Sequence, residues 1–203
     1  MFTPTKIIAI GLNYHDHARE LNMPIPEYPL IFMKPSTAVI GNRDAIIYPS
    51  ICKELHYEGE LAIIIKERCR HVKRGDASRF IAGYTCANDV TARDIQRLDG
   101  QWTRSKSFDT FCPLGPRLVE GIDTAQLNIV TRVNGIVRQN SNTEMMVFDV
   151  FELVSFVSSI MTLLPGDVII TGTPAGVGPL EVGDEVEVEI ERIGILRNKV
   201  ERE

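Results

Sequence analysis

The chain has 203 residues, 44% of them hydrophobic and 24% charged, and its formal net charge at pH 7 is −5. This length is typical of one domain, so residues 1–203 are predicted to fold as a single domain around a substantial apolar core. The acidic balance and the lack of a basic block disfavour a nucleic-acid partner. No apolar run approaches the roughly 18 residues that a transmembrane helix needs, so no membrane partner is expected.

Four widely spaced cysteines and a short apolar N-terminus bear on the compartment. Cys52, Cys69, Cys86 and Cys112 form no CxxC pair, which argues against a zinc site. Free, buried thiols are the simplest interpretation, and they suit a reducing compartment. The N-terminal stretch MFTPTKIIAIG has too short an apolar run for a signal peptide and lacks a small-residue cleavage site. These features predict a cytoplasmic protein.

The first predicted elements are a strand over Lys6–Leu12 and a short helix over His15–Leu21, with Asn13 as its N-cap. His17 and Glu20 are three residues apart, so their side chains are neighbours on the helix surface. A carboxylate beside an imidazole sets its tautomer and raises its basicity, as a general base requires. The alternative is a solvated surface pair, which the spacing alone favours because such pairs are common.

Three prolines between Asn22 and Pro29 exclude regular structure there, and the segment is predicted to be a hinge or the edge of a lid. A short strand over Leu30–Met33 follows and delivers Lys34. Lys34 is interpreted either as a contact for an anionic substrate or as an ordinary lysine at a strand end.

The most informative stretch joins two acids to a buried strand. Glu58 and Glu60 precede the apolar run Leu61–Ile65, and side chains two residues apart in a strand share a face. Two like charges at the edge of a core repel each other and lose hydration, and a bound cation removes both costs. Asp89, after the strand-like run Phe80–Asn88, is the candidate third ligand, and three oxygen ligands suit Mg2+, with Mn2+ or Ca2+ as alternatives. The simpler alternative is an exposed strand with alternating acids.

A helix is predicted to begin just after Asp89, with Thr91 as a candidate N-cap. Arg93 and Gln96 share one face of this helix, and its N-terminus favours an anion. The stretch Trp102–Asp109 has no clean periodicity and is predicted to be a loop that carries Lys106. Such loops often hold functional residues, but ordinary surface loops look the same.

The C-terminal half is predicted to contain strands around one long helix. Apolar residues at helical spacing predict a buried helix over Val150–Leu163. A two-residue hairpin turn is expected at Asn134–Gly135. The predicted strands are Pro116–Val119, Leu127–Val133, Val168–Ile170, Glu185–Glu191 and Ile195–Val200.

A glycine-rich segment follows the strand that ends at Ile170. The stretch Thr171–Pro179 lacks the lysine of a phosphate-binding P-loop and the GxGxxG of a dinucleotide fold, so both interpretations are rejected. Its glycines either let the backbone approach a small ligand, with Thr171 and Thr173 as hydroxyl donors, or form a tight turn between two strands.

The order of motifs resembles the fumarylacetoacetate hydrolase family. The chain carries GLNYHDHARE, FMKPST, HYEGELAIII, NDVTARDIQ, WTRSKSFDTFCPLGP, VNG and LLPGDVIITGTPAGVGP, and the resemblance spans residues 6–200. It is nearest to the compact branch of acylpyruvases, oxaloacetate decarboxylases or tautomerases, and hydroxymuconate-type isomerases. The resemblance implies an α+β fold, a strand-rich mixed sheet rolled into a half-open barrel, and a homodimer.

The resemblance also implies a role for each matching residue. Glu58, Glu60 and Asp89 match the family's ligands for a metal, usually Mg2+. The remaining matches are a catalytic set of His17 and Glu20, on a lid of about residues 13–29, with Lys106, and substrate contacts at Arg93, Gln96 and Thr173. The segment between Gln96 and Trp102 is shorter than in close relatives, so the resemblance does not define the outer wall of the pocket or the tail of the substrate.

The implied function is a Mg2+-dependent enzyme that acts on small 2-oxo (di)carboxylic acids through an enolate held at the metal. Because the His17–Glu20 pair suits activation of water, acylpyruvate C–C bond hydrolysis is the favoured reaction. The alternatives are a 2-hydroxyhepta-2,4-diene-1,7-dioate or 5-carboxymethyl-2-hydroxymuconate isomerase, and an oxaloacetate decarboxylase or tautomerase. A non-catalytic binding module and a purely structural metal site are the alternatives from other classes.

Overall fold

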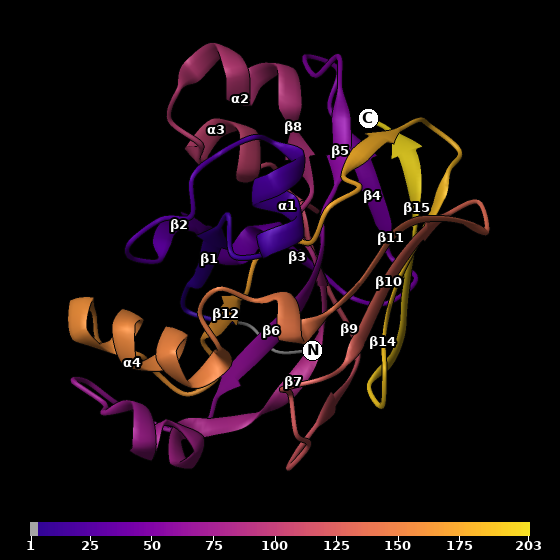
Figure 1. The fold of residues 1–203 in the computed structure, drawn as a ribbon. Helices are drawn as coiled ribbons and strands as arrows, with labels where there is room; N and C mark the ends of the chain where they lie inside the picture. The colour runs from indigo at the N-terminus through magenta and orange to yellow at the C-terminus, as the bar shows by residue number, and fades with distance from the viewer. Residues whose placement is uncertain (1–3) are drawn as a thin grey trace.

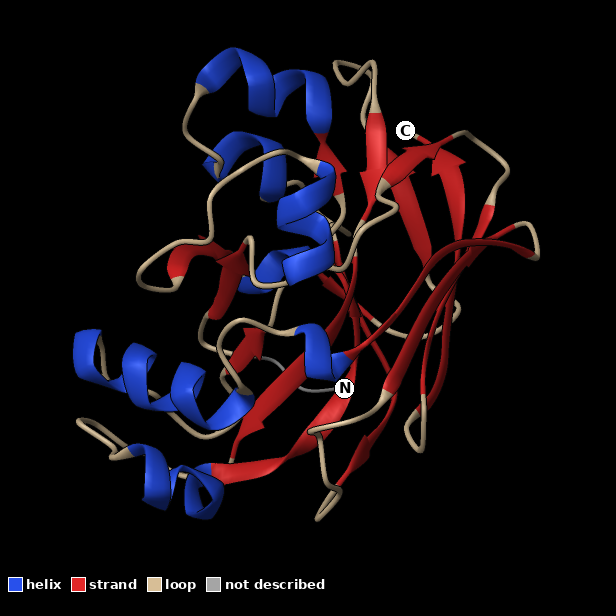
Figure 2. Ribbon diagram, viewed as in Figure 1, coloured by secondary structure: helices blue, strands red, loops and turns tan. Residues whose placement is uncertain are grey.

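The computed structural model describes residues 4–203, and strands in three β-sheets form most of its framework (Figures 1 and 2). The largest sheet has seven strands in the order β2-β1-β12-β6-β7-β9-β3. In chain order they are β1 Ile7–Gly11, β2 Leu30–Lys34, β3 Val39–Ile40, β6 Gly59–Ile65, β7 Ile81–Asn88, β9 Cys112–Val119 and β12 Val168–Ile170. The pairs β1–β12 and β3–β9 are parallel and the other neighbours are antiparallel, so the sheet is mixed.

Two smaller sheets complete the strand framework. The five-stranded sheet has the order β11-β10-β14-β15-β4, and the three-stranded sheet has the order β13-β5-β8. Their strands are β4 Ala45–Tyr48, β5 Leu55–Tyr57, β8 Thr91–Ala92, β10 Asn128–Val133, β11 Ile136–Asn142, β13 Gly178–Leu180, β14 Glu185–Ile190 and β15 Gly194–Arg202. The predicted turn between β10 and β11 is confirmed, because Asn134 and Gly135 both have positive φ, as a type I′ hairpin requires.

Within the described residues, four α-helices and three 3₁₀ helices flank the sheets. They are α1 His15–Glu20, α2 Arg93–Asp99, α3 Thr103–Lys106, α4 Val150–Ile160, η1 Ser36–Ala38, η2 Arg74–Phe80 and η3 Thr143–Met145. The helices α1, α2 and α3 gather at one end of the molecule, whereas α4 lies beside η2 at the other end of the large sheet (Figures 1 and 2). Among residues 4–203, no helix combines the length and apolar character needed to cross a membrane.

The strand β6 is apolar from Leu61 to Ile65, and both of its faces are buried there. Leu61, Ile63 and Ile65 pack in one core cluster together with residues of α4, and Ala62 and Ile64 pack in another on the opposite face. The seven-stranded sheet, with β6 as its central strand, curls into a half-barrel. The predicted α+β class and the half-open barrel are therefore confirmed.

Four local predictions need correction. Asn13 is not a helix N-cap, since Tyr14 holds that position and the Asn13 amide binds Phe148 and Thr171 instead. Thr91 is not an N-cap either, because β8 pairs with β5 and α2 begins later, at Arg93.

The other two corrections concern helix boundaries. Lys106 lies at the end of the short helix α3 rather than in a loop. The helix α4 ends at Ile160 rather than Leu163, because Leu163 exchanges two backbone hydrogen bonds with Cys69.

Candidate active site

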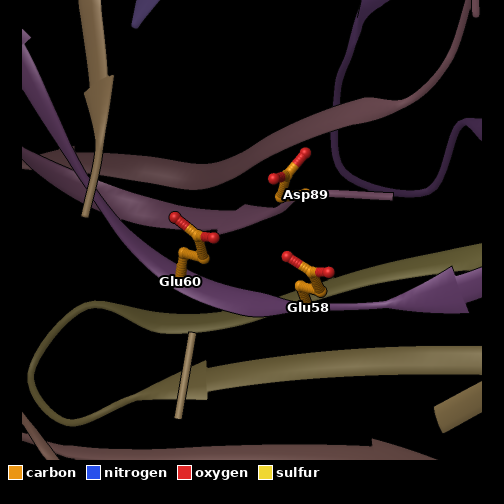
Figure 3. A group of neighbouring side chains, drawn as sticks. All are labelled: Glu58, Glu60 and Asp89. Atoms are coloured by element: carbon orange, nitrogen blue, oxygen red, sulfur yellow. The ribbon is translucent and has the colours of Figure 1, made fainter. Parts of the chain in front are cut away.

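Three carboxylates meet where β6 begins and β7 ends. Glu58 directly precedes β6, Glu60 is its second residue, and Asp89 directly follows β7. The amide of Asp89 donates a 2.8 Å hydrogen bond to the carbonyl of Glu58, which brings the two acids together. Each residue offers an oxygen within 4.8 Å of the others, and Figure 3 shows the three side chains around one small space. All three residues are buried, so the exposed-strand alternative does not apply.

Three cationic side chains surround this cluster of acids. Lys106 Nζ lies 2.9 Å from Glu58 Oε2 and 2.6 Å from Asp89 Oδ2. Lys34 Nζ lies 2.5 Å from Asp89 Oδ1, and Arg93 binds Glu58. Three carboxylates and three cations therefore balance in formal charge.

The two glutamates experience opposite electrostatic environments. Burial, followed by the charges of Asp89 and Glu58, raises the pKa of Glu60 well above its usual value. Burial also acts to raise the pKa of Glu58, but the charges of Lys106 and Arg93 outweigh it and hold that pKa well below its usual value. Within residues 4–203, Glu60 has no cation bound to it; its Oε2 accepts a 2.7 Å hydrogen bond from the amide of Gly172.

The donor set fits a hard divalent cation. Three buried carboxylates supply only oxygen ligands, which Mg2+, Mn2+ and Ca2+ all prefer. A divalent ion would also relieve the repulsion that disfavours the charged form of Glu60. Glu58, Glu60 and Asp89 would hold it.

The predicted His17–Glu20 pair forms a hydrogen bond. His17 Nδ1 lies 3.0 Å from Glu20 Oε2 on α1, with the imidazole mostly buried and the carboxylate more exposed. Glu20 also accepts from the amide of Gly176, at 3.1 and 3.2 Å to its two oxygens. The glycine-rich segment thus anchors the acid that orients the histidine.

A cavity of about 480 Å³ lies between the dyad and the acids. Its polar lining comprises His17, His56, Glu58, Glu60, Arg93, Gln96, Arg97, Lys106 and Thr173. His17, Lys106, Arg93, Gln96 and Thr173 were all expected at the site from the sequence. They come from α1, α3, α2 and the segment after β12, so only folding brings them together.

Lys34 does not line this cavity. Its ammonium is buried against Asp89 Oδ1 and also reaches the carbonyl of Val90 at 3.2 Å. In this structure Lys34 is thus the partner of an acid and lies outside the cavity lining, and its contact with an anionic substrate stays a prediction.

Thr173 and Thr171 tie the glycine-rich segment to β6. Thr173 Oγ1 donates to the carbonyl of Gly59 at 3.0 Å, and Thr171 Oγ1 donates to that of Leu61 at 3.0 Å. Gly172 between them has φ +93°, and a Cβ there would lie 2.8 Å from the Cβ of Asn13. The glycine is therefore required for the close approach of this segment to Asn13. The predicted approach of the backbone to a small ligand stays a prediction.

His56 is a cavity residue that the sequence reasoning missed. Its Nε2 lies 2.8 Å from Glu54 Oε1, and Arg93 Nε lies 3.4 Å from its Nδ1. Burial, then the charge of Arg93, lowers the pKa of His56. Its spacing of two residues before Glu58 was the signal that could have found it, because alternate side chains of an extended segment point to one side.

Comparison with known proteins places the chain in a family. The model of the fumarylacetoacetate (FAA) hydrolase C-terminal region matches residues 6–201. An uncharacterized protein of Methanocaldococcus jannaschii is 64% identical over 200 residues, which cover 98% of this chain and 84% of that protein. A mitochondrial oxaloacetate tautomerase of Bos taurus is 48% identical over 209 residues, covering 97% of this chain and 67% of the tautomerase.

Solved structures agree with the sequence relatives. The crystal structure of 5-carboxymethyl-2-hydroxymuconate delta-isomerase from Mycobacterium smegmatis has a TM-score of 0.94 and 51% identity, covering 100% of this chain and 80% of that one. The 2-hydroxyhepta-2,4-diene-1,7-dioate isomerase of Mycobacterium marinum has a TM-score of 0.93 and 48% identity, covering 100% and 76%. From its motifs, its fold and these matches, the chain belongs to the fumarylacetoacetate hydrolase family.

Proposed function

We propose that this chain is a metal-assisted enzyme that moves a proton between carbon and oxygen in a small 2-oxo acid, interconverting its keto and enol forms. The observation that carries the proposal is one cavity with an oriented histidine, His17, and a buried ammonium, Lys106, beside three acids. The relatives named as an oxaloacetate tautomerase and a hydroxymuconate isomerase support it, since tautomerisation is a proton shift.

Glu58, Glu60 and Asp89 are proposed to hold the ion, with Mg2+ as the first choice. The ion supplies Lewis-acid polarisation of the 2-oxo group when bound. Lys106 is 2% exposed, so its ammonium is shielded from bulk water and stabilises negative charge that develops on the same oxygen. Arg93, Gln96 and Thr173 line the cavity and are proposed to orient the substrate carboxylate.

His17 is proposed to carry the proton. Because Glu20 accepts from Nδ1, the ring proton lies there and the lone pair of Nε2 is free. Nε2 takes a proton from the carbon next to the 2-oxo group. The released electron pair forms the carbon–carbon double bond, and the carbonyl oxygen takes the negative charge. The oxygen then takes the proton from His17 Nε2, which returns the imidazole to its neutral form. The reverse steps restore the keto form.

Acylpyruvate hydrolysis, which the sequence favoured, is the second candidate. The specific observation in its favour is the same dyad, because an imidazole with a carboxylate at Nδ1 also activates water. In that reaction water attacks the distal carbonyl, the carbon–carbon bond breaks, and the pyruvate enolate leaves.

Turnover assays separate these reactions. Each of oxaloacetate, acetylpyruvate and a hydroxymuconate-type diene acid is incubated with the protein in Mg2+, in Mn2+ or in EDTA. Loss of the ultraviolet absorbance of enol-oxaloacetate, faster than the buffer rate and suppressed by EDTA, supports the tautomerase. Pyruvate release from acetylpyruvate supports a hydrolase. CO2 release from oxaloacetate supports a decarboxylase, and rearrangement of the diene acid supports an isomerase.

A matched pair of variants tests the role of the dyad. We expect His17→Asn to lower turnover by about 100- to 10,000-fold, as loss of general base catalysis does. His15→Asn changes an exposed histidine of the same helix and should keep full turnover. Equal rates for the two variants would sink the proposal for His17.

The assembly and the compartment are also proposals. We propose a cytoplasmic homodimer built from a single domain per chain, supported by the sequence features and the family resemblance. Size-exclusion chromatography with in-line light scattering measures the molar mass of the assembly. A monomeric mass at every concentration used in the assays would contradict the dimer.

A further inference from the structure

The proposed substrate cavity has a charged inner part and an apolar outer part. Glu58, Glu60 and Lys106 lie at the inner end, and each is at most 7% exposed. The outer walls come from β1 and its C-terminal loop, the lid segment, β2 and the turn before α3. Their apolar lining includes Leu12, Leu21, Met23, Leu30, Phe32 and Trp102.

Two aromatic rings form the boundary between these parts. Phe32 and Trp102 pack edge to face with their ring centroids 5.1 Å apart, and Lys106 Nζ lies 5.1 Å from the Phe32 centroid. Trp102 also packs on Gly11 so closely that a Cβ there would lie 2.8 Å from the indole ring. Packing therefore fixes the positions of these two rings. Phe32 faces the Lys106 ammonium, and Trp102 continues the wall towards the apolar side chains of the outer part.

The rim beyond this wall holds large apolar side chains open to solvent. Leu21 is 47% exposed, Met23 51% and Leu30 47%, and all three line the cavity. Water contact with these side chains is unfavourable, and a ligand that covers them gains binding free energy in proportion to the apolar surface that it buries.

The cavity has few means of binding a second carboxylate at its outer end. Its arginines and its lysine already have acid partners: Lys106 on Glu58 and Asp89, Arg93 on Glu58, and Arg97 on Glu54. Arg97 is the outermost of these cations, with its side chain 61% exposed. A distal carboxylate would therefore have to share this one exposed guanidinium with Glu54 or stay unpaired beside apolar side chains.

We propose that this site selects a 2-oxo acid whose far end is an apolar chain rather than a second carboxylate, with Leu21, Met23, Leu30 and Trp102 as the specificity determinants. The inference rests on the proposed function, because that function places the 2-oxo carboxylate at the acid cluster. It goes further in naming what occupies the outer part of the cavity.

Equilibrium binding of simple 2-oxo acids tests this selection without turnover. Calorimetric titration of the Mg2+-loaded protein compares 2-oxohexanoate with 2-oxoadipate, which differ only in a terminal carboxylate. It then follows the series 2-oxobutanoate, 2-oxohexanoate and 2-oxooctanoate. We expect affinity to rise about two- to fourfold per methylene, and 2-oxohexanoate to bind at least about tenfold more tightly than 2-oxoadipate.

Matched variants locate the determinant. Met23→Ser should flatten the chain-length series, whereas Leu98→Ser should not, because Leu98 is 78% exposed on α2 and lies outside the cavity lining. Arg97→Gln should leave the ratio between 2-oxohexanoate and 2-oxoadipate unchanged. Tighter binding of 2-oxoadipate, lost in Arg97→Gln, would overturn the proposal in favour of a dicarboxylate.

Two further outcomes keep this inference separate from the proposed function. Graded binding of the alkyl series without any turnover supports the apolar selection while the proposed reaction fails. The other outcome has two parts: affinity does not change along the 2-oxo acid series, and the protein is a dimer that Met23→Ser converts to a monomer. This result would show that a second copy of the chain covers the exposed apolar side chains, and it would overturn the inference.

Discussion

The ammonium nitrogen of Lys34 lies 2.5 Å from Asp89 Oδ1, and both side chains are almost fully excluded from solvent. Removing one member of a buried ion pair leaves the other charge uncompensated. We expect Lys34→Met to lower the free energy of unfolding by about 3 kcal/mol, since such losses are typically 3–5 kcal/mol and Lys106 still binds Asp89. Urea denaturation measures this loss.

An exposed pair is the control for that variant. Arg79 lies 3.9 Å from Asp76, with side chains 74% and 54% exposed, so Arg79→Met should change the free energy of unfolding by less than about 0.5 kcal/mol. Adding Asp89→Asn to Lys34→Met should recover part of the loss, because the uncompensated charge is removed. Equal stability of the two single variants would contradict the assigned pairing.

Metal binding should depend on pH through Glu60. Burial and the charges of Asp89 and Glu58 raise the pKa of Glu60, so part of the metal-free protein carries a proton there at pH values above the ordinary carboxyl range. A metal needs the carboxylate and therefore expels that proton. Affinity should rise with pH up to the raised pKa and then level off.

Calorimetry detects the expelled proton. Titrations of Mn2+ in two buffers of equal pH but different protonation enthalpy should give different apparent heats of binding. Glu60→Gln cannot release this proton, so its smaller heat should not depend on the buffer, whereas Glu67→Gln, an exposed acid, should behave like the unchanged protein. Buffer-independent heats for the unchanged protein would refute the raised pKa.

Gly176 should tolerate no side chain. It has φ +96°, and a Cβ would lie 2.2 Å from the carbonyl oxygen of Arg138. Its amide holds Glu20, and its carbonyl accepts from the Tyr57 hydroxyl at 2.9 Å. Gly176→Ala should therefore lower the free energy of unfolding by about 2 kcal/mol or more and reduce turnover, because the segment must shift away from Glu20.

Gly75 provides the comparison for that substitution. A Cβ there would meet nothing within 4 Å, and its φ is not positive. Gly75→Ala should leave turnover unchanged and keep or raise stability by about 0.4–1 kcal/mol. Thermal unfolding and turnover are measured for both alanine variants. A fully active Gly176→Ala variant would contradict the role of Gly176 in holding Glu20.

The cysteines should be unreactive in the folded protein. All four are free and buried, as the sequence predicted. Burial raises the pKa of Cys52 to about 11 and those of Cys86 and Cys112 to about 12, so the reactive thiolate is scarce at neutral pH. A chromogenic disulfide reagent should release nearly no colour from the native protein and four equivalents after denaturation. Rapid release of one equivalent from the native state would contradict this expectation.

The sequence by itself determined the features that depend on short spacing. The two-residue period of a strand placed Glu58 and Glu60 on one face, and the apolar run after them required burial on both faces of β6. Likewise Asn134–Gly135 specified a hairpin, and the three-residue spacing of His17 and Glu20 brought their side chains within hydrogen-bond reach. These rules work because neighbouring backbone geometry alone sets the relation.

Tertiary structure alone decided which partner each charged or polar group meets. Lys34 could have faced a ligand, but the register of β2 on β1 and the end of β7 bring it to Asp89. Asparagine is a residue type typical of an N-cap, yet the side-chain amide of Asn13 forms hydrogen bonds with the backbones of Phe148 and Thr171, both more than 130 residues away. Such pairings follow from long-range packing, where local propensity is too weak to choose a partner.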